Sequence, residues 1–229
     1  MLSAIIVAGG SSQRMGFDKL FAIIAGEPVI AHTIRAFEHA TSISEIVVVA
    51  REERHDEIRK ISRDTGFQKI RSIVPGGERR QDSVRAGLDQ IDREAKYVAV
   101  HDAARPLITA EQIERAFDQC RVHGSAALAQ PVNDTLKRAD ADLLVVGLVD
   151  RHRLYAMQTP QIFERKLIED AYRGVYAENA SVTDEVSAVE RLGHKIALVL
   201  NDDFNFKITY PHDLPVADFI LRQRANHCR

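Results

Sequence analysis

Cysteine is scarce in this chain, and tryptophan is absent. The two cysteines, Cys120 and Cys228, lie far apart in the sequence and match neither a metal-binding spacing nor a disulfide framework. The chain is therefore expected to fold without disulfides, and a reducing cytoplasm is the expected compartment.

Long apolar runs and an excess of one charge are also missing. Glycines end the first apolar run well before it could span a bilayer, and that run has neither a basic flank nor a cleavage site. The 31 basic and 33 acidic side chains leave a net charge of −2. This balance argues against a nucleic acid or a membrane as the main partner, but it allows a local basic pocket for a small anion.

Short apolar strands alternate with amphipathic helical segments, which is typical of an α/β fold. The length of 229 residues fits a single domain, 1–229, with a mostly parallel twisted sheet and helices on both faces. Strands are expected at 2–7, 45–50, 70–74, 97–101, 126–130 and 196–200, and helices at 28–40, 53–64, 82–92, 110–123, 165–173, 184–192 and 211–224. Ligands of such a sheet bind beyond the carboxyl ends of its strands.

Residues 133–161 break this alternation, because they show no helical period. Residues 135–138 and 143–151 resemble two strands that are joined by a polar turn, so the segment predicts a β-hairpin. The four consecutive apolar residues 143–146 indicate that this hairpin packs against something. We expect an arm that reaches a second subunit, and the alternative is an antiparallel edge of the main sheet.

The first strand leads into a Gly- and Ser-rich segment with two cations close behind it: Gly9, Gly10, Ser11, Ser12, Arg14 and Lys19. Glycines let backbone N–H groups crowd around an anion, and the cations supply charge where phosphates would lie. The segment therefore predicts a polyphosphate site at the end of the strand. The alternative is an ordinary strand–helix turn that required small residues.

A second cluster, VAVHDAARP, places Asp102 just past a predicted strand and Arg105 three residues later. A carboxylate at that end of the sheet can hold a divalent cation, although an Asp–Arg ion pair is the simpler interpretation. In a doubly wound sheet this strand can lie close to the Gly-rich segment. His101 receives no role.

Three further segments are consistent with a nucleotide site and with plain structural roles. Gly77 and Ser83, in a strand–loop–helix connection, suit a nucleobase or ribose contact or a helix cap, and the intervening Arg79 and Arg80 resemble solvated loop charges. Thr183 is a plausible N-cap, and the acidic residues 184–185 suit the helix dipole. Lys207 interrupts an apolar strand expected at 205–209, so it faces either solvent or the cleft.

Together these motifs resemble the 2-C-methyl-D-erythritol 4-phosphate cytidylyltransferases, over nearly the whole chain and in the family's order. The specific combination is GGERRQDSV, HDAARP, DTLKR, TPQ-x-F and VTDE. The resemblance implies a Rossmann-like nucleotidyltransferase fold and a homodimer with exchanged hairpin arms at about 133–161. It also implies transfer of CMP from CTP to 2-C-methyl-D-erythritol 4-phosphate, with release of pyrophosphate, in non-mevalonate isoprenoid synthesis.

The resemblance also implies residue roles. The expected CTP contacts are Gly9, Gly10, Ser11, Ser12, Arg14, Lys19, Gly77, Ser83 and Ala103. The expected acceptor contacts are Asp102, Arg105, Thr135, Arg151, Thr159, Thr183, Asp184 and Lys207, with Arg151 arriving from the neighbouring subunit. Asp102 would hold Mg²⁺, and the catalytic set would be Arg14, Lys19, Asp102 and Lys207.

The chain departs from the family pattern in its first loop, where only MGFD separates Arg14 from Lys19. The family usually has a longer spacer that ends in Pro-Lys-Gln, and the short form resembles the RMG-x-x-K loops of molybdenum-cofactor nucleotidyltransferases. A ribitol 5-phosphate cytidylyltransferase, a molybdopterin nucleotidyltransferase and a non-catalytic nucleotide-binding module remain as alternatives. An NAD-dependent dehydrogenase is disfavoured, because the loop lacks G-x-G-x-x-G.

Overall fold

The computed structural model describes residues 1–10 and 15–227. Within these residues, the main sheet has seven strands: β1 (Leu2–Ala8), β4 (Ile43–Ala50), β5 (Ile70–Pro75), β6 (Tyr97–Asp102), β7 (Ser125–Pro131), β10 (Tyr155–Glu164) and β11 (Ala197–Leu200). Their order is β11-β7-β10-β6-β1-β4-β5. All neighbouring pairs are parallel except those of β10, which runs antiparallel to β6 and β7. The predicted α/β class with a mostly parallel sheet is confirmed.

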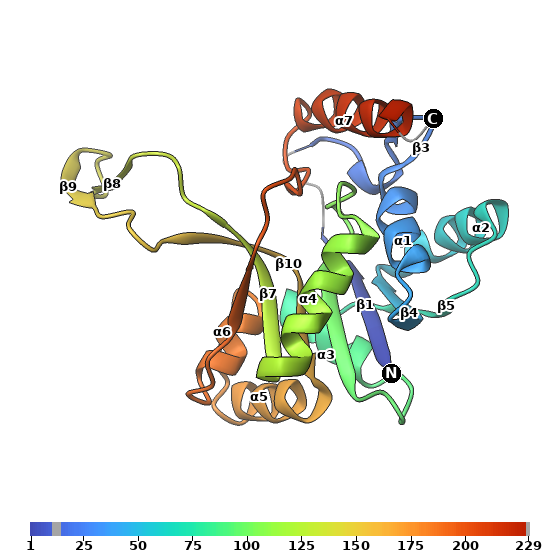
Figure 1. Cartoon of the computed structure of the whole chain (residues 1–229), viewed down its shortest axis with the longest axis horizontal. Coiled ribbons are helices and arrows are strands. Elements are labelled where there is room, and N and C mark those ends of the chain that lie inside the picture. Colours follow the sequence, from blue (N-terminus) through green and yellow to red (C-terminus); the bar gives the residue numbers. More distant parts are fainter. Residues whose placement is uncertain (11–14, 228–229) are drawn as a thin grey trace.

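Helices cover both faces of this sheet (Figure 1). Their bounds are α1 (Val29–His39), α2 (His55–Thr65), α3 (Arg80–Leu88), α4 (Ala110–His123), α5 (Arg165–Ala177), α6 (Glu185–Glu190) and α7 (Asp213–His227). Successive side chains of β1 serve different cores: Ala4 and Ile6 join the core that includes α1, α2, α4 and α7, whereas Ile5 joins that of α3, α5 and α6. This alternation is the two-residue period of a strand that is buried on both faces.

The elements predicted from the sequence occur with shifted ends. Each of the six expected strands and seven expected helices overlaps an observed one, but α3 spans Arg80–Leu88 instead of 82–92. Shorter elements join them: the 3₁₀ helices η1 (Lys19–Phe21) and η2 (Glu52–Arg54) and the small hairpin β2 (Ile23–Ile24) with β3 (Glu27–Pro28). The strand expected at 205–209 is wrong, because that segment joins no sheet in the described part of the chain.

The segment expected as an arm, 133–161, is shorter in the structure. Tyr155–Glu164 forms β10 in the main sheet, and its register shifts between Met157 and Gln161, on either side of the Thr159–Pro160 bond. A proline inside a run argues against a central strand, so the sequence did not indicate β10. The register shift lets the sheet continue past the proline.

A hairpin arm remains, and it projects from one side of the body (Figure 1). β8 (Leu136–Ala139) pairs antiparallel with β9 (Val145–Val149) in a separate two-stranded sheet, so the alternative of an edge strand on the main sheet is wrong. Large apolar side chains of the arm lie open, with Leu143 85% exposed. Exposed apolar clusters of this kind mark surfaces that bind a partner.

The helices were also compared with the length and hydropathy of a bilayer span. Among the described residues, no helix is both long enough and apolar enough to cross a membrane.

Candidate active site

Two parallel strands bring the first two sequence clusters together. β1 and β6 are neighbours in the sheet, with Val7 opposite Asp102, and the Ala103 N–H donates to the Val7 carbonyl at 3.0 Å. Gly9 and Gly10, which follow β1, therefore lie beside Asp102 at the carboxyl edge of the sheet. Open α/β sheets bind their ligands at this edge.

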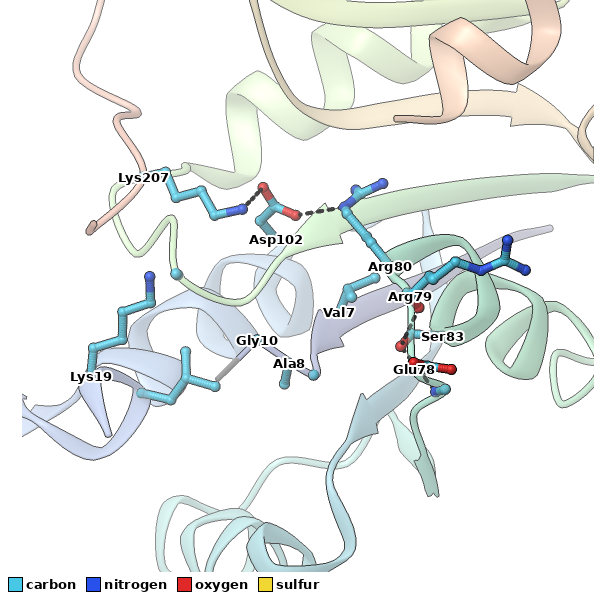
Figure 2. A pocket seen from close by; sticks show the side chains of 14 residues that line it. Val7, Ala8, Gly10, Lys19, Glu78, Arg79, Arg80, Ser83, Asp102 and Lys207 are labelled. Atoms are coloured by element: carbon cyan, nitrogen blue, oxygen red, sulfur yellow. Dashed lines mark hydrogen bonds and ion pairs between the residues drawn. The ribbon is translucent and has the colours of Figure 1, made fainter. Parts of the chain in front are cut away.

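Two adjoining pockets lie at this edge. The first has a volume of about 350 Å³ and is lined by Gly9, Gly10, Lys19, Gly77 and Ser83, among others. The second, of about 230 Å³, is lined by Arg105, Thr159, Thr183 and Asp184, among others. Both pockets share Arg80, Asp102 and Lys207 as lining residues. Figure 2 shows these three side chains in a row, with Asp102 between the two cations.

Asp102 is the centre of a cluster of positive charge. Lys207 Nζ donates to Asp102 Oδ2 at 2.9 Å, Arg80 Nε donates to Oδ1 at 3.3 Å, and Arg105 Nε lies 3.7 Å from Oδ2. Burial alone would raise the pKa of Asp102, but the three cations outweigh it and hold the pKa well below its usual range. The carboxylate is thus ionised and fixes three cations at the boundary of the two pockets.

Arg80 is a site residue that the sequence analysis missed. Its Nη1 and Nη2 donate to the two oxygens of Glu185 at 2.6 and 3.0 Å, and the Tyr172 hydroxyl donates to Glu185 Oε1 at 3.0 Å. Burial lowers the pKa of Arg80, but Glu185 and Asp102 raise it by more, so the guanidinium keeps its charge. The expectation of a solvated charge is wrong for Arg80, whereas Arg79 is exposed and pairs with Asp82 at 2.9 Å.

Thr159 links Asp102 to His101. The Asp102 N–H donates to Thr159 Oγ1 at 3.1 Å, and that hydroxyl lies 3.0 Å from His101 Nδ1. Burial lowers the pKa of His101 to about 3, so the ring is neutral near pH 7. Its Nε2 faces the Arg105 carbonyl, which can only accept, at 3.3 Å, so Nε2 carries the proton and Nδ1 accepts from Thr159. His101 therefore positions Thr159 and is not available for proton transfer.

Lys207 reaches the site from an extended segment that is held to the body by hydrogen bonds. The Ile208 N–H donates to the Ala104 carbonyl at 2.8 Å, and Arg105 Nη1 donates to the Asn205 carbonyl at 2.8 Å. The Lys207 side chain is 43% exposed and points to Asp102, so of the two expected orientations it faces the cleft. Lys19 Nζ donates to the Ile208 carbonyl at 2.5 Å, which ties the first loop to this segment.

Gly77 and Ser83 form one corner of the first pocket. The Gly77 N–H donates to Ser83 Oγ at 3.2 Å. A Cβ at Gly77 would lie 2.3 Å from that of Asp82, so glycine is required for this turn. The helix is capped by Arg79 and Asp82, because the Arg79 N–H donates to Asp82 Oδ2 at 3.0 Å. Ser83 is thus held in the pocket by the turn and does not cap the helix.

Thr183 and Asp184 line the second pocket, but their capping roles differ from the prediction. Asp184 is the N-cap of α6, and its Oδ1 accepts from the Ser187 N–H at 2.9 Å. Thr183 precedes the cap, and its hydroxyl lies 3.2 Å from that of Ser187. The expected N-cap at Thr183 is therefore wrong by one residue.

Other expected site residues are not gathered at the pockets. Ser11, Ser12 and Arg14 lie outside the described residues, as does Cys228. Ala103 is buried, and its carbonyl accepts from Thr33 Oγ1 at 2.9 Å, while its neighbour Ala104 lines the first pocket. Thr135 and Arg151 line neither of the two pockets described above. Both residues are exposed near the arm, where Arg151 donates to the Asn133 carbonyl.

The donor set for a metal ion is small. Residues 1–10 and 15–227 contain no group of three or more His, Cys, Asp or Glu side chains that could hold one. Asp102 is the carboxylate at the shared wall, and both of its oxygens already pair with cations. Mg²⁺ commonly binds through one or two carboxylates together with substrate phosphates, and Asp102 fits that arrangement and not an all-protein cage.

Comparisons with known proteins agree on one family. The family model described as 2-C-methyl-D-erythritol 4-phosphate cytidylyltransferase matches residues 2–223. A protein of that name from Caldanaerobacter subterraneus subsp. tengcongensis is 42% identical over 225 residues, covering 97% of this chain and 99% of the relative. Another, from Halalkalibacterium halodurans, is 37% identical over 224 residues, with 97% of each covered.

Solved structures of the same family resemble this fold. The 4-diphosphocytidyl-2C-methyl-D-erythritol synthase of Anaerococcus prevotii superposes with a TM-score of 0.85 at 30% identity, covering 97% of this chain and 96% of the other. The 2-C-methyl-D-erythritol 4-phosphate cytidylyltransferase of Francisella tularensis gives a TM-score of 0.78 at 28% identity, with 95% and 98% covered.

Proposed function

Since the chain belongs to the 2-C-methyl-D-erythritol 4-phosphate cytidylyltransferase family, we propose that its two adjoining pockets seat the two substrates of that reaction. The enzyme transfers CMP from CTP to 2-C-methyl-D-erythritol 4-phosphate in isoprenoid synthesis and releases pyrophosphate. CTP occupies the first pocket and the acceptor occupies the second. The observation that carries this assignment is the wall of Arg80, Asp102 and Lys207 that the pockets share.

The chemical step is an in-line substitution at the α-phosphorus of CTP. An oxygen of the acceptor phosphate forms the new bond to phosphorus, while the bond to the bridging oxygen of the β-phosphate breaks and pyrophosphate leaves. The attacking oxygen is already deprotonated near pH 7, so no general base is needed. Catalysis therefore consists of alignment and charge neutralisation between two anions that repel each other.

Cations from several segments of the chain supply this neutralisation. Lys207 and Arg14 stabilise charge at the α-phosphate, and Lys19 stabilises the departing pyrophosphate. Asp102 holds the Lys207 ammonium at the boundary of the pockets through a 2.9 Å hydrogen bond. The acceptor then meets Arg105, Thr159, Thr183 and Asp184 in the second pocket. Ionised Asp102 keeps Lys207, Arg80 and Arg105 in place without taking part in proton transfer.

Mg²⁺ is the proposed cofactor. Asp102 would be the protein ligand at the shared wall, with the remaining ligands supplied by phosphate oxygens and water. When bound, the ion offsets the negative charge of the triphosphate.

A homodimer with exchanged arms would complete the second pocket. The exposed Leu143 side chain and its apolar neighbours on the arm are a surface that a second copy would cover. Thr135 and Arg151 are exposed near the arm, and a partner's pocket is where the family pattern would place them. The proposed compartment is the cytoplasm.

The assay is direct: purified protein, CTP, Mg²⁺ and 2-C-methyl-D-erythritol 4-phosphate, with pyrophosphate as the readout. Ribitol 5-phosphate replaces the acceptor in a parallel reaction, and a metal chelator is added in a third. We expect pyrophosphate with the methylerythritol substrate, little with ribitol 5-phosphate and none with the chelator. Binding of CTP without pyrophosphate release would overturn the proposal in favour of a non-catalytic binding module.

A further inference from the structure

Arg54 is a buried cation next to the first pocket that the mechanism above does not use. It is the last residue of η2 and follows β4, whose final residue Ala50 lies opposite Ala8 of β1. Its side chain is only 3% exposed. A charged side chain at that burial needs fixed partners, because desolvation would otherwise be costly.

Those partners come from two segments of the sequence, one before residues 11–14 and one after them. Arg54 Nη1 donates to the Ala8 carbonyl, and Nη2 donates to the Gly10 carbonyl at 2.9 Å. Nε donates to Asp18 Oδ2 at 2.6 Å. One guanidinium therefore holds the Ala8 carbonyl and the residue that precedes Lys19. It also holds the Gly10 carbonyl, which accepts from Arg51 Nη2 as well at 2.9 Å.

The orientation of these carbonyls matters for an anion in the first pocket. In a trans peptide the C=O and the next N–H point in opposite directions, so an Ala8 carbonyl that faces Arg54 directs the Gly9 N–H away from it. Gly9 and Gly10 both line the first pocket. Turning carbonyl oxygens toward Arg54 removes negative dipole ends from the side where phosphates would lie.

The Asp18 contact fixes Lys19 as well. Asp18 Oδ1 accepts from the Leu20 N–H at 3.2 Å and forms the N-cap of η1, which begins at Lys19. Asp18 is thus held from one side by Arg54 and from the other by the helix that carries Lys19. The short MGFD spacer places Asp18 directly before the lysine, where this link can act.

We infer that Arg54 is a positioning residue for the triphosphate of CTP, acting through the carbonyls of Ala8 and Gly10 and through Asp18. This inference rests on the proposed assignment of the first pocket to CTP. A lysine at this position would keep the charge but would lose the planar fork that reaches three acceptors at once. The substitution should therefore weaken binding of the triphosphate and leave binding of the nucleoside nearly unchanged.

The test compares CTP and CMP binding by titration calorimetry at 15 °C in wild type, Arg54→Lys and Asp18→Asn. Arg59→Lys is the matched control, because Arg59 is an exposed α2 arginine that pairs with Asp56 at 2.9 Å. We expect Arg54→Lys to weaken CTP binding by about tenfold or more and CMP binding by less than about twofold. Asp18→Asn should give a smaller loss in the same direction, and Arg59→Lys should bind both nucleotides as wild type does.

Steady-state kinetics provide a second readout that a general loss of stability would not produce. The KM for CTP should rise in Arg54→Lys, while the KM for the acceptor changes little. A folded Arg54→Lys variant with wild-type CTP affinity, or with equal losses for CTP and CMP, overturns the inference. If Arg54→Lys does not fold, wild-type CTP affinity in Asp18→Asn overturns it. Failure of the wild-type chain to bind CTP would instead overturn the pocket assignment, and the inference with it.

Discussion

At the scale of single residues, the proposed reaction depends on the ion pair between Asp102 and Lys207. The Lys207 ammonium lies at the boundary of the pockets, is partly exposed and is absent from the hydrophobic core. Its function is therefore separable from folding. The carboxylate that holds it comes from the end of β6, so the sheet itself sets the position of the charge.

The first prediction concerns Lys207→Ala. We expect kcat to fall by about 10³-fold or more, because a cation that stabilises transferring phosphate has effects on this order. The melting temperature should stay within a few degrees of wild type, since the substitution buries nothing and opens no cavity. Pyrophosphate release and thermal denaturation measure the two quantities. Near-normal turnover in the variant would remove Lys207 from the mechanism.

The second prediction concerns the buried His101 and pH. Its pKa is about 3 in the folded protein and about 6.5 when unfolded, so the unfolded chain binds more protons between these values. The effect of His101 on the free energy of unfolding is therefore most favourable above pH 6.5. The free energy of unfolding falls as the pH drops toward 3, by up to about 1.4 kcal/mol per pH unit. Denaturant unfolding at several pH values measures this slope.

The control is His101→Gln, which removes the titrating group and keeps hydrogen-bonding atoms. Its slope between pH 6.5 and 4 should be smaller than that of wild type. Asp102 contributes to the pH dependence in a lower range, because its pKa is lowered from the ordinary value of 3.8 and its stabilising effect is lost only below that pH. A slope measured between pH 6.5 and 4 therefore reports on His101 and not on Asp102. An unchanged slope in the variant would show that folding does not lower the pKa of His101.

The roles of Arg80 and Arg54 could not be predicted from the sequence. The Gly-rich segment and Asp102 could be predicted, because glycine and carboxylate positions after strands carry a local signal. Arg80 pairs with Glu185, which is 105 positions away, and Arg54 contacts carbonyls and Asp18 across two segments. Nothing in the neighbouring sequence distinguishes such an arginine from a solvated one.

Among the secondary-structure elements, those with a regular apolar pattern were predictable and the others were not. β4 and β6 each contain consecutive buried apolar residues, 46–50 and 98–100, and α4 is bounded by its Thr109 cap and by Gly124, with φ of 78°. β10 was missed because Thr159–Pro160 interrupts it. The segment around Lys207 was expected as a strand, but its backbone hydrogen bonds go to Ala104 and Arg105.

The arm gives the third prediction, at the scale of an element. Arg151→Ala should raise the KM for 2-C-methyl-D-erythritol 4-phosphate much more than the KM for CTP. The physical reason is that Arg151 lies near the arm, which would deliver its charge to the acceptor pocket and not to the nucleotide pocket. Initial rates with each substrate varied in turn give both constants.

Arg153→Ala is a suitable control for this experiment, because Arg153 is exposed two residues away and was given no role. Its constants should match those of wild type. Equal increases in both KM values for Arg151→Ala would argue against the assignment of Arg151 to the acceptor.

For the whole molecule, the proposed dimer divides each active site between two chains. Lys207 belongs to the body, whereas Arg151 follows β9 (Val145–Val149) of the arm that projects from the body (Figure 1). If arms are exchanged, each site combines Lys207 of one copy with Arg151 of the other. Two variants that are each impaired at both sites can then form a mixed dimer with one intact site.

The fourth prediction follows from this geometry. Lys207→Ala and Arg151→Ala chains are unfolded together, refolded at equal concentrations and then assayed at a low acceptor concentration. We expect about a quarter of the wild-type rate, because half of the dimers are mixed and each mixed dimer has one intact site of two. Each variant refolded alone should remain far below that rate. Mixing is verified by different affinity tags on the two chains. Mixed dimers that form but recover no activity would place Arg151 and Lys207 of a site on the same chain, and the arm would then serve only to hold the subunits together.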